Sequence, residues 1–413
     1  MPGSLTSCRS CGSTDLREVI SLGLMPLVNH FISESEVDAE KKYPLDLVFC
    51  ATCTLTQLST VVPGEILYRN YMHMSSAAES NIRHLKTVSN LIQNRWVRNQ
   101  RNRILEIGSN DGTLLSFLRE SCDVLVGVDP AVNLRAISKN QSADIVTEFF
   151  SADIAETIAN DYGTFDVVIG LNVAAHGDNL NGFLRGVHTT LAPNGTVILE
   201  VAYVLETILD GGFDTIYHEH VYSFSLHSIS AAFERAGLTV VDVEKVDTQG
   251  GSLRVFGQRT QDDPKPLQSV KQVLDTEANR GLINAAVYET VPIKAQKFKE
   301  KLRSLVRDLK LEHGRMVGLG APARGVVILN YCGIGRDDLA YIIDDTPLKQ
   351  GKLLPGMHIP IRDWDHLNVD SSTAFLMLSW NYAREITQKL HAHVDSGTTI
   401  IPFPEMTTVS HGR

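Results

Sequence analysis

The sequence predicts an α/β protein with three parts: a small metal-binding module, a nucleotide-binding type of α/β domain, and a second α/β domain of similar kind. Three observations support this prediction. Two C-x-x-C pairs lie within the first 53 residues, a strand–turn–helix pattern surrounds residue 108, and the same pattern recurs near residue 320. A chain of 413 residues is also too long for one ordinary core. We place the divisions so that the parts span residues 1–68, 69–260 and 261–413.

The composition is that of a globular protein and limits the classes of function. The net charge of −10 argues against a protein that holds nucleic acid through phosphate contacts. No apolar run of about 18 residues is present, and the first residues lack the apolar core of a secretory signal. We therefore expect a cytoplasmic protein with neither nucleic-acid nor membrane partners, acting as a monomer.

The amino-terminal module is predicted from four cysteines. Cys8 and Cys11 form one C-x-x-C pair, and Cys50 and Cys53 form the other. This spacing lets two thiolates from each turn reach one tetrahedral ion, and in a reducing compartment such pairs are more often metal ligands than disulfides. Four sulfurs close the site, so we expect a structural Zn²⁺. Two unrelated thiol pairs and a redox pair remain the alternatives.

The middle domain begins with a buried strand at residues 104–107, and residues 108–112 form a turn before a helix. About twenty residues later, "VLVGVDP" reads as a second strand that ends at Asp129. Glycines let the backbone approach a ligand at the carboxyl end of a strand, and an acid after the second strand can accept hydrogen bonds from ribose hydroxyls.

The turn reads E-x-G-x-N-x-G and lacks the glycine spacing of a dinucleotide-binding dehydrogenase, which is the competing interpretation. Its acid and amide suit a ligand without a pyrophosphate, and S-adenosylmethionine fits. "FFSADIA" adds an acid that could read an adenine, although a surface acid is the other interpretation, and "FDVVIGLNVAAH" adds a fourth strand. Together these segments resemble the class I methyltransferase pattern. The candidate cofactor-binding residues are Glu106, Gly108, Asn110, Gly112, Asp129, Asp153 and Asn172.

A polar segment, "FDTIYHEHVYSFSL", follows the next strand and contains His218-Glu219-His220. In an extended segment His218 and His220 would point the same way. A metal site, an acid/base cluster and a polar structural turn are the three interpretations. We favour the acid/base cluster, because an imidazole can remove a proton from a carbon acid near neutral pH.

The motifs in order resemble the sugar C-methyltransferases of deoxysugar pathways, which methylate carbon 3 of a nucleotide-linked 4-keto sugar. The resemblance covers nearly the full length and rests on "CRSC…CATC", "EIGSNDGTLL", "NVAAH", "FDTIYHEH", "GGSLRVF", "GLGAPARG" and "YIIDDTPLKQGKLLPGMHIPI". It implies His220 as the catalytic base. It further implies Tyr217, Glu219 and His176 as active-site partners, with Tyr217 and His176 donating to an enolate oxygen and Glu219 orienting His220 or binding a sugar substituent.

One segment departs from the family pattern. The family often carries a Y-x-Y-x-S-S type of segment after the zinc module, whereas this chain reads "YMHMSS". His73 stands where a second tyrosine would be expected. We name Tyr71, His73 and Ser75 as candidate substrate-binding residues, and a loop without a ligand role is the alternative.

The carboxyl-terminal domain repeats the strand–turn–helix pattern with "GLGAPARG", followed by an acid after the next strand. Helix N-terminal amides and an arginine can hold phosphate. We therefore expect the nucleotide diphosphate of the substrate, a TDP-linked sugar, to lie at Gly320, Arg324, Asp344 and Lys349. A structural pseudo-repeat without a ligand is the alternative.

The sequence thus predicts C-methylation at carbon 3 of a nucleotide-diphospho-4-keto-deoxysugar, with S-adenosylmethionine as methyl donor and an enolate intermediate. Methyl transfer to oxygen or nitrogen of a related sugar or small metabolite is the second hypothesis. A non-catalytic zinc-bearing scaffold is the third, and the intact Gly108, Gly112 and Asp129 argue against it.

Overall fold

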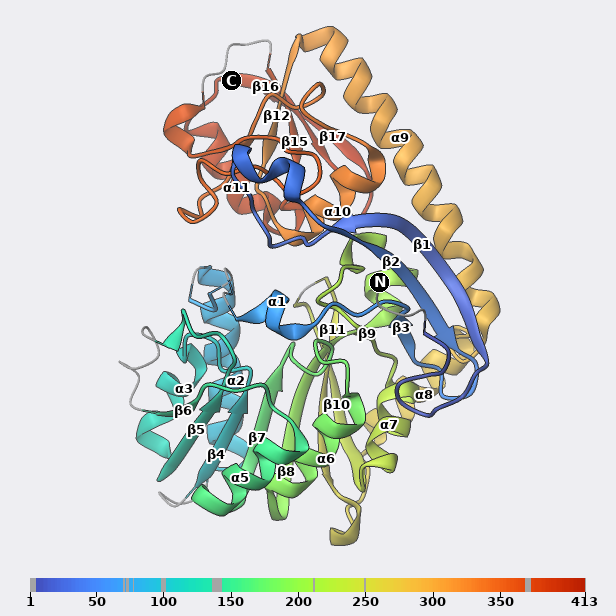
Figure 1. Ribbon diagram of the computed structural model, residues 1–413, viewed down its shortest axis with the longest axis vertical. Coiled ribbons are helices and arrows are strands. Elements are labelled where there is room, and N and C mark those ends of the chain that lie inside the picture. Colours follow the sequence, from blue (N-terminus) through green and yellow to red (C-terminus); the bar gives the residue numbers. More distant parts are fainter. Residues whose placement is uncertain are drawn as a thin grey trace.

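The computed structural model describes residues 5–69, 71, 74–76, 78–97, 102–135, 143–210, 212–248, 250–367 and 373–412. Its strands form sheets of four, seven and six strands. Figure 1 shows the six-stranded sheet and the seven-stranded sheet at opposite ends of the molecule, with the ribbon of the first two strands running along one side between them. The α/β fold class predicted from the sequence is confirmed.

The four-stranded sheet, in the order β1-β2-β3-β9, joins the first part of the chain to the middle part. Its strands are β1 (Leu16–Pro26), β2 (Lys42–Cys50), β3 (Thr56–Leu58) and β9 (Tyr222–Ser223). The strand β9 follows the His218–His220 segment directly and pairs antiparallel with β3. The zinc module therefore contacts the predicted catalytic segment through main-chain hydrogen bonds.

The seven-stranded sheet has the order β10-β11-β8-β7-β4-β5-β6. Neighbouring strands from β6 to β8 pair in parallel, and β11 is inserted antiparallel between β8 and β10. Strand order reverses at β4, the switch point where such sheets bind ligands. The strands are β4 (Arg103–Ile107), β5 (Val124–Val128), β6 (Asp144–Val146), β7 (Phe165–Leu171), β8 (Leu191–Ala202), β10 (Leu238–Val246) and β11 (Ser252–Arg259).

Three of the helices around this sheet begin at residues whose side chains cap them. The side chains of Ser151, Asn179 and Ser225 each accept a hydrogen bond from a first-turn N–H, which satisfies one orphan donor of the helix. The helices are α1 (Gly64–Tyr68), α2 (Glu79–Arg95), α3 (Thr113–Leu118), α5 (Ala152–Tyr162), α6 (Leu180–Thr190), α7 (Leu226–Arg235) and α8 (Gln268–Asn279).

The six-stranded sheet has the order β14-β13-β12-β15-β16-β17, parallel except for β17. The long helix α9 (Thr290–His313) precedes it and runs along one side of the molecule (Figure 1). The other elements are β12 (Arg315–Leu319), α10 (Ala323–Cys332), β13 (Ile342–Ile343), β14 (Ile361–Arg362), β15 (Thr373–Met377), α11 (Ala383–His391), β16 (Ser396–Ile401) and β17 (Thr407–Gly412).

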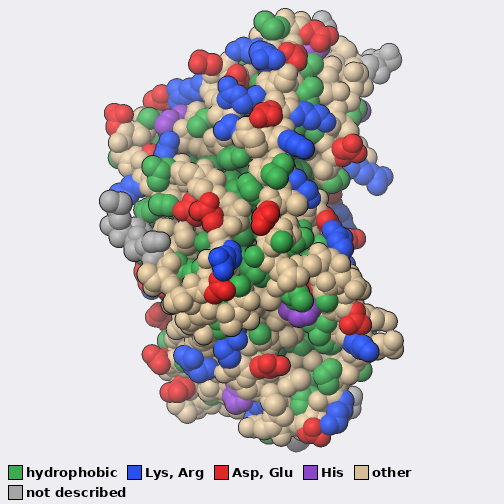
Figure 2. All heavy atoms as spheres, turned by 90° about the vertical axis from the view of Figure 1, so that its right-hand side faces the viewer, with side chains coloured by type: hydrophobic (Ala, Val, Ile, Leu, Met, Phe, Trp, Pro, Cys, Tyr) green, Lys and Arg blue, Asp and Glu red, His purple; other side chains and the backbone are tan. Residues whose placement is uncertain are grey.

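On the face in Figure 2, acidic and basic side chains are interspersed and do not gather in one field of a single sign. Within the described residues, none of the helices combines the length and apolar character needed to cross a membrane. The divisions at residues 68/69 and 260/261 remain a prediction.

Candidate active site

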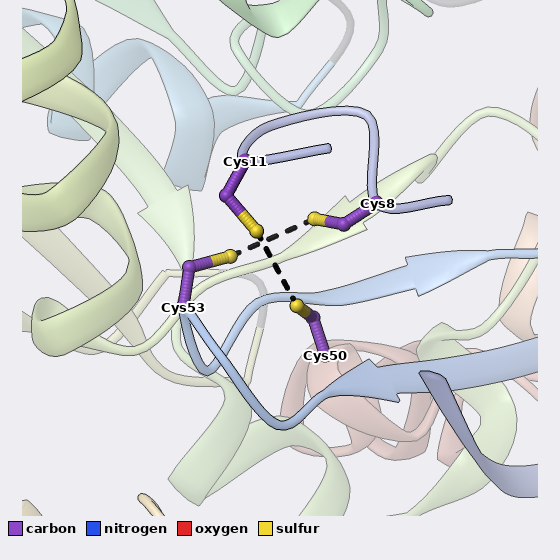
Figure 3. A group of neighbouring side chains, drawn as sticks. All are labelled: Cys8, Cys11, Cys50 and Cys53. Carbon is purple, nitrogen blue, oxygen red and sulfur yellow. Dashed lines mark hydrogen bonds between the residues drawn. The ribbon is translucent and has the colours of Figure 1, made fainter. Parts of the chain in front are cut away.

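The four cysteines of the zinc module converge on one point. The Sγ atoms of Cys8, Cys11, Cys50 and Cys53 all lie within 4.8 Å of one another, with Cys8–Cys53 and Cys11–Cys50 separations of 3.6 Å (Figure 3). A tetrahedron with Zn–S bonds of about 2.3 Å has edges of about 3.8 Å, so the four sulfurs fit Zn²⁺. The amide of Gln57, on β3, donates to Cys8 Sγ at 3.1 Å and orients that ligand.

The turn after β4 is held by Asp129, the acid that ends β5. One carboxylate oxygen accepts the Asn110 N–H at 2.8 Å, and the other accepts the Ala131 N–H at 2.9 Å. Gly108, Asn110 and Gly112 all have positive φ, between 50° and 77°. The structure therefore brings these four predicted cofactor residues together at the carboxyl end of β4 and β5.

The segment after the zinc module lies against this turn. The Ser75 N–H donates to Asn110 Oδ1 and the Ser76 N–H donates to Asp111 Oδ2, each at 2.9 Å. Ser75 therefore lies beside the predicted cofactor turn. Its assignment as a substrate-binding residue did not predict this contact. His73 lies outside the described residues.

Glu106, on β4, tests whether the turn fits S-adenosylmethionine. Its side chain is buried, and its Oε2 atom has no hydrogen-bond partner among the described residues. Burial raises its pKa well above the usual range, and the charges of Asp129 and Asp111 raise it further. A ligand that brings a positive charge and hydroxyl donors would satisfy this acidic pocket, and S-adenosylmethionine has both.

The remaining two predicted cofactor residues differ in position. Asn172 follows β7 with φ +56°, and its N–H donates to the Glu200 carbonyl on the neighbouring strand β8. Asp153 lies exposed in the first turn of α5. Its role toward an adenine stays a prediction.

His220 is oriented by the main chain. Its Nδ1 lies 2.9 Å from the Thr215 carbonyl oxygen, an acceptor that requires Nδ1 to carry the proton. Nε2 is then the unprotonated nitrogen. Burial lowers the pKa of His220 to about 4, and the charge of Arg324 acts in the same direction, so the ring is neutral at physiological pH. A neutral imidazole with a fixed tautomer is ready to accept a proton.

Two rings, those of Tyr217 and His176, pack against the His220 ring. The Tyr217 ring lies 3.9 Å from the His220 ring, measured between centroids, and His176 stacks on His220 at 5.5 Å. His176 in turn stacks on Tyr68 of α1 at 5.5 Å. The structure therefore brings the predicted catalytic residues Tyr217, His176 and His220 together, and it adds Tyr68.

The expectation that His218 and His220 share one face is wrong. The segment is a turn, closed by a hydrogen bond from the His220 N–H to the Tyr217 carbonyl, and not an extended strand. His218 is buried, with Nε2 3.2 Å from the Pro44 carbonyl and its ring edge-on to Tyr43. His218 therefore packs against the zinc module, which removes the geometry on which a metal site shared by the two imidazoles would depend.

The side chain of Glu219 accepts one hydrogen bond on each of its carboxylate oxygens. Asn29 Nδ2 donates to Oε1 at 2.6 Å, and Tyr71 Oη donates to Oε2 at 3.1 Å. Burial raises the pKa of Glu219 to about 7, although both hydrogen bonds oppose that shift. Tyr71 therefore lies beside the predicted catalytic segment, and its role as a substrate-binding residue stays a prediction, whereas the group that orients His220 is the Thr215 carbonyl.

Arg324 belongs to α10 but contacts the catalytic segment. Its guanidinium makes two hydrogen bonds to the buried carboxylate of Asp214, at 2.9 and 3.0 Å, and lies over the Trp380 ring at 4.3 Å. Trp380 Nε1 also donates to Asp214. Gly250, with φ +85°, permits this approach, because a Cβ there would lie 2.9 Å from Arg324 Nη1. Arg324 therefore links the carboxyl-terminal domain to the residues just before Tyr217.

Gly320, Asp344 and Lys349 form one loop cluster after β12 and β13. Asp344 accepts the Ala321 N–H at 2.7 Å and the Thr346 N–H at 2.8 Å, and Lys349 Nζ lies 3.6 Å from the same carboxylate. Burial opposes ionisation, yet Lys349 and these hydrogen bonds lower the pKa of Asp344. The acid is ionised and its charge is balanced within the domain.

Sequence reasoning missed several of these residues. Thr215 acts through its carbonyl, which leaves no signal in the side-chain pattern. Asn29 and Tyr68 lie in the zinc module and α1, and their contacts depend on how β3 meets β9. His84, on α2, is also new: its Nε2 lies 2.7 Å from the buried Glu200 carboxylate, which also pairs with Arg254.

Comparison with known proteins agrees with this architecture. Residues 8–68 match a family model described as "Putative zinc binding domain", residues 80–243 match "Methyltransferase domain", and residues 247–404 match "C-methyltransferase C-terminal domain". The C-methyltransferase NovU of Streptomyces niveus is 34% identical over 408 residues, which cover 98% of this chain and 97% of that protein.

Two further proteins are similar over parts of the chain. The ubiquinone biosynthesis O-methyltransferase of Azorhizobium caulinodans is 33% identical over 98 residues, 24% of this chain and 39% of that protein. The magnesium protoporphyrin IX methyltransferase of Synechocystis PCC 6803, solved with bound S-adenosylmethionine, is 14% identical, covers 44% of this chain and 82% of its own, and has a TM-score of 0.33.

The fold and site define a class I, S-adenosylmethionine-dependent methyltransferase with a structural zinc module. The full-length relative and the match to the C-methyltransferase C-terminal domain show the family. The chain belongs to the C-methyltransferase family that carries an amino-terminal zinc-binding domain. The family predicted from the sequence motifs is confirmed.

Proposed function

We propose that the protein methylates carbon 3 of a nucleotide-diphospho-4-keto-deoxysugar, with TDP as the nucleotide, and that His220 is the catalytic base. The observation that carries this proposal is the His220–Thr215 hydrogen bond, which leaves Nε2 of a neutral imidazole as a proton acceptor. Transfer to carbon needs such a base, because the carbon must lose a proton before it can act as a nucleophile.

The ketone at carbon 4 would make the proton on carbon 3 acidic. His220 Nε2 takes that proton, and the electron pair of the C–H bond is delocalised as an enolate. S-adenosylmethionine supplies the electrophilic methyl group. As negative charge grows on the enolate oxygen, it raises the pKa of the nearby imidazole and so favours the proton transfer.

Tyr217 and His176 are proposed as donors to the enolate oxygen. Both rings pack directly on His220, so a ketone beside the base would lie near their polar ends. Burial and the charge of Glu219 raise the pKa of Tyr217 above its usual value, so the phenol keeps its proton and stays a donor. Glu219 and Tyr71 would bind a hydroxyl or amine of the sugar.

We propose that the carboxyl-terminal domain binds the nucleotide diphosphate at the loop cluster of Gly320, Asp344 and Lys349. Because Arg324 pairs with the buried Asp214, its role is to anchor the cluster against the proposed catalytic segment, and Lys349 is the better candidate for a phosphate contact.

The test is product analysis with S-adenosylmethionine and a TDP-4-keto-6-deoxysugar, comparing wild type with His220→Asn. We expect one methyl group on carbon 3, located by NMR, and a rate about 10³-fold lower in the variant, since general bases contribute roughly 10²–10⁴-fold. Ser228→Ala, which alters a polar side chain that bonds to Ser225 in the capping box of α7, is the control. A methyl group on oxygen or nitrogen would contradict the proposal.

A further inference from the structure

One side chain of the zinc module reaches the predicted catalytic segment. Asn29 lies in the turn after β1, and its amide donates to Glu219 Oε1 at 2.6 Å although the two residues are 190 positions apart. Asn29 contacts Glu219 and not the four cysteines, so zinc binding does not explain this side chain.

The chemical type of this contact is informative. Glu219 is buried, and its oxygens accept from an amide and a phenol, both neutral groups. Among the described residues it forms no ion pair within 4.0 Å. Neutral donors orient a carboxylate and stabilise its charged form without cancelling the charge. A carboxylate held in this way remains able to bind a hydroxyl or ammonium group of a ligand.

The zinc module, which contains Asn29, is joined by hydrogen bonds to the chain just after Glu219. The Leu58 N–H donates to the Val221 carbonyl at 2.8 Å, and Thr56 Oγ1 donates to the Ser223 carbonyl at 2.6 Å. These bonds join β3 of the zinc module to the residues just after His220. The position of Asn29 relative to Glu219 is therefore set by a sheet that both parts of the chain build.

We propose that Asn29 is a positioning residue of the methyl-transfer site, through which the zinc module fixes the orientation and the ionised form of Glu219. The catalytic meaning of this inference rests on the proposed function, in which Glu219 binds a hydroxyl or amine of the sugar. The hydrogen bond itself is testable without any substrate.

The groups that face Glu219 determine what a titration reports. Tyr71 and Tyr68 contact its side chain and backbone carbonyl, and Tyr217 precedes it in the turn. Burial is the main cause that raises the pKa of each of these phenols, and the charge of Glu219 raises it further. His220, with its pKa lowered to about 4, stays neutral throughout the neutral range, and Arg324 is paired with Asp214.

The experiment is an infrared pH titration of the buried carboxylic acid band in the zinc-loaded protein. Subtracting the spectra of Glu219→Gln isolates the band of Glu219 from that of Glu106. We expect a wild-type midpoint near pH 7. In Asn29→Ala the midpoint should rise by about one pH unit, because the lost hydrogen bond stabilised the charged form.

Asn181→Ala is the matched control. Asn181 also joins the zinc module to the middle domain, through the carbonyls of Arg9 and Ser10, but it does not contact Glu219. It should leave the midpoint unchanged. Asn29→Asp, nearly equal in shape, carries the test if the alanine variant does not fold, and it should raise the midpoint because it replaces a donor with a second acid.

The inference would be overturned if the midpoint of Asn29→Ala stayed at the wild-type value, or if Asn181→Ala shifted it equally. If Asn29→Ala does not fold, the midpoint of Asn29→Asp decides in its place. The methylation assay is a separate arm. If the wild type methylates the keto sugar, Asn29→Ala should move the acid limb of kcat/KM upward by the same amount and Asn181→Ala should not. If no keto sugar is methylated, the proposed function fails while the infrared result still decides whether Asn29 sets the charge of Glu219.

Discussion

The turn after β4 and the turn after β12 are built alike but differ in charge. In each, an acid after the next strand accepts two backbone N–H groups: Asp129 holds Asn110 and Ala131, and Asp344 holds Ala321 and Thr346. In each, a glycine with positive φ follows the first strand, Gly108 at +74° and Gly320 at +83°. The shared geometry explains why the sequence shows the same pattern twice.

The difference lies in what balances the acids. In the described part of the middle domain, Glu106, Asp111 and Asp129 cluster without an ion pair, and burial raises the pKa values of Glu106 and Asp129. In the carboxyl-terminal domain Lys349 faces Asp344, and Arg324 pairs with Asp214. The two turns thus share a topology but differ in charge: the acids of the first have no counter-charge among the described residues, whereas Lys349 balances Asp344 in the second.

The largest effect should come from breaking the ion pair between Arg324, on the helix that follows the second turn, and Asp214. Asp214→Asn removes the buried carboxylate that pairs with the Arg324 guanidinium, and removing one partner of a buried pair costs about 3–5 kcal/mol. We expect a loss of about 3 kcal/mol in the free energy of unfolding, measured by urea titration. Glu34→Gln, in the exposed pair with Arg336, is the control and should cost far less, because solvent screens an exposed pair. Equal costs would show that burial does not distinguish the pairs.

The next largest effect compares the two acids directly. Asp129→Ala should weaken S-adenosylmethionine binding about 30-fold or more, because the turn loses two charge-assisted bonds worth roughly 1.5–3 kcal/mol each. Asp344→Ala removes the equivalent bonds of the other turn. It should leave that affinity within about twofold and weaken TDP-sugar binding instead. Calorimetry with each ligand checks both, and loss of methyl-donor affinity in the Asp344 variant would contradict the division of labour.

A smaller effect should follow from Glu106→Gln. An acid whose folded-state pKa is raised costs stability as pH rises above its unfolded value. The stability of the variant should therefore decline less with rising pH than that of the wild type. It should also bind S-adenosylmethionine about tenfold more weakly, since one charged contact is lost. Melting temperature against pH, with and without ligand, measures both. A variant that gains stability and keeps its affinity would exclude Glu106 from the pocket.

Much of the fold could be predicted because it depends on local patterns. The C-x-x-C spacing, the strand–turn–helix order around Gly108 and its repeat around Gly320 each reflect a backbone requirement that only certain residues meet. The joining of β9 to the zinc module could not be predicted, since two residues, Tyr222 and Ser223, carry no periodicity that would identify a strand.

The site was predicted in its residue types but not in its contacts. His220, Tyr217 and His176 follow from the family motifs, and the structure brings them together. The extended-segment assumption failed at His218, because a turn reverses the chain there. Asn29 and Asp214 were missed for a different reason. Their importance arises from neighbours that are far away in sequence, and no local pattern indicates a buried pairing.

The measurement that tests the central claim most directly is solvent deuterium exchange at carbon 3 of the TDP-4-keto-deoxysugar, with S-adenosylhomocysteine in place of the methyl donor so that methylation cannot hide it. We predict exchange catalysed by the wild type and a loss of about 10³-fold in His220→Asn. No exchange in the wild type, or exchange at an undiminished rate in His220→Asn, would contradict a carbanion mechanism that uses this base.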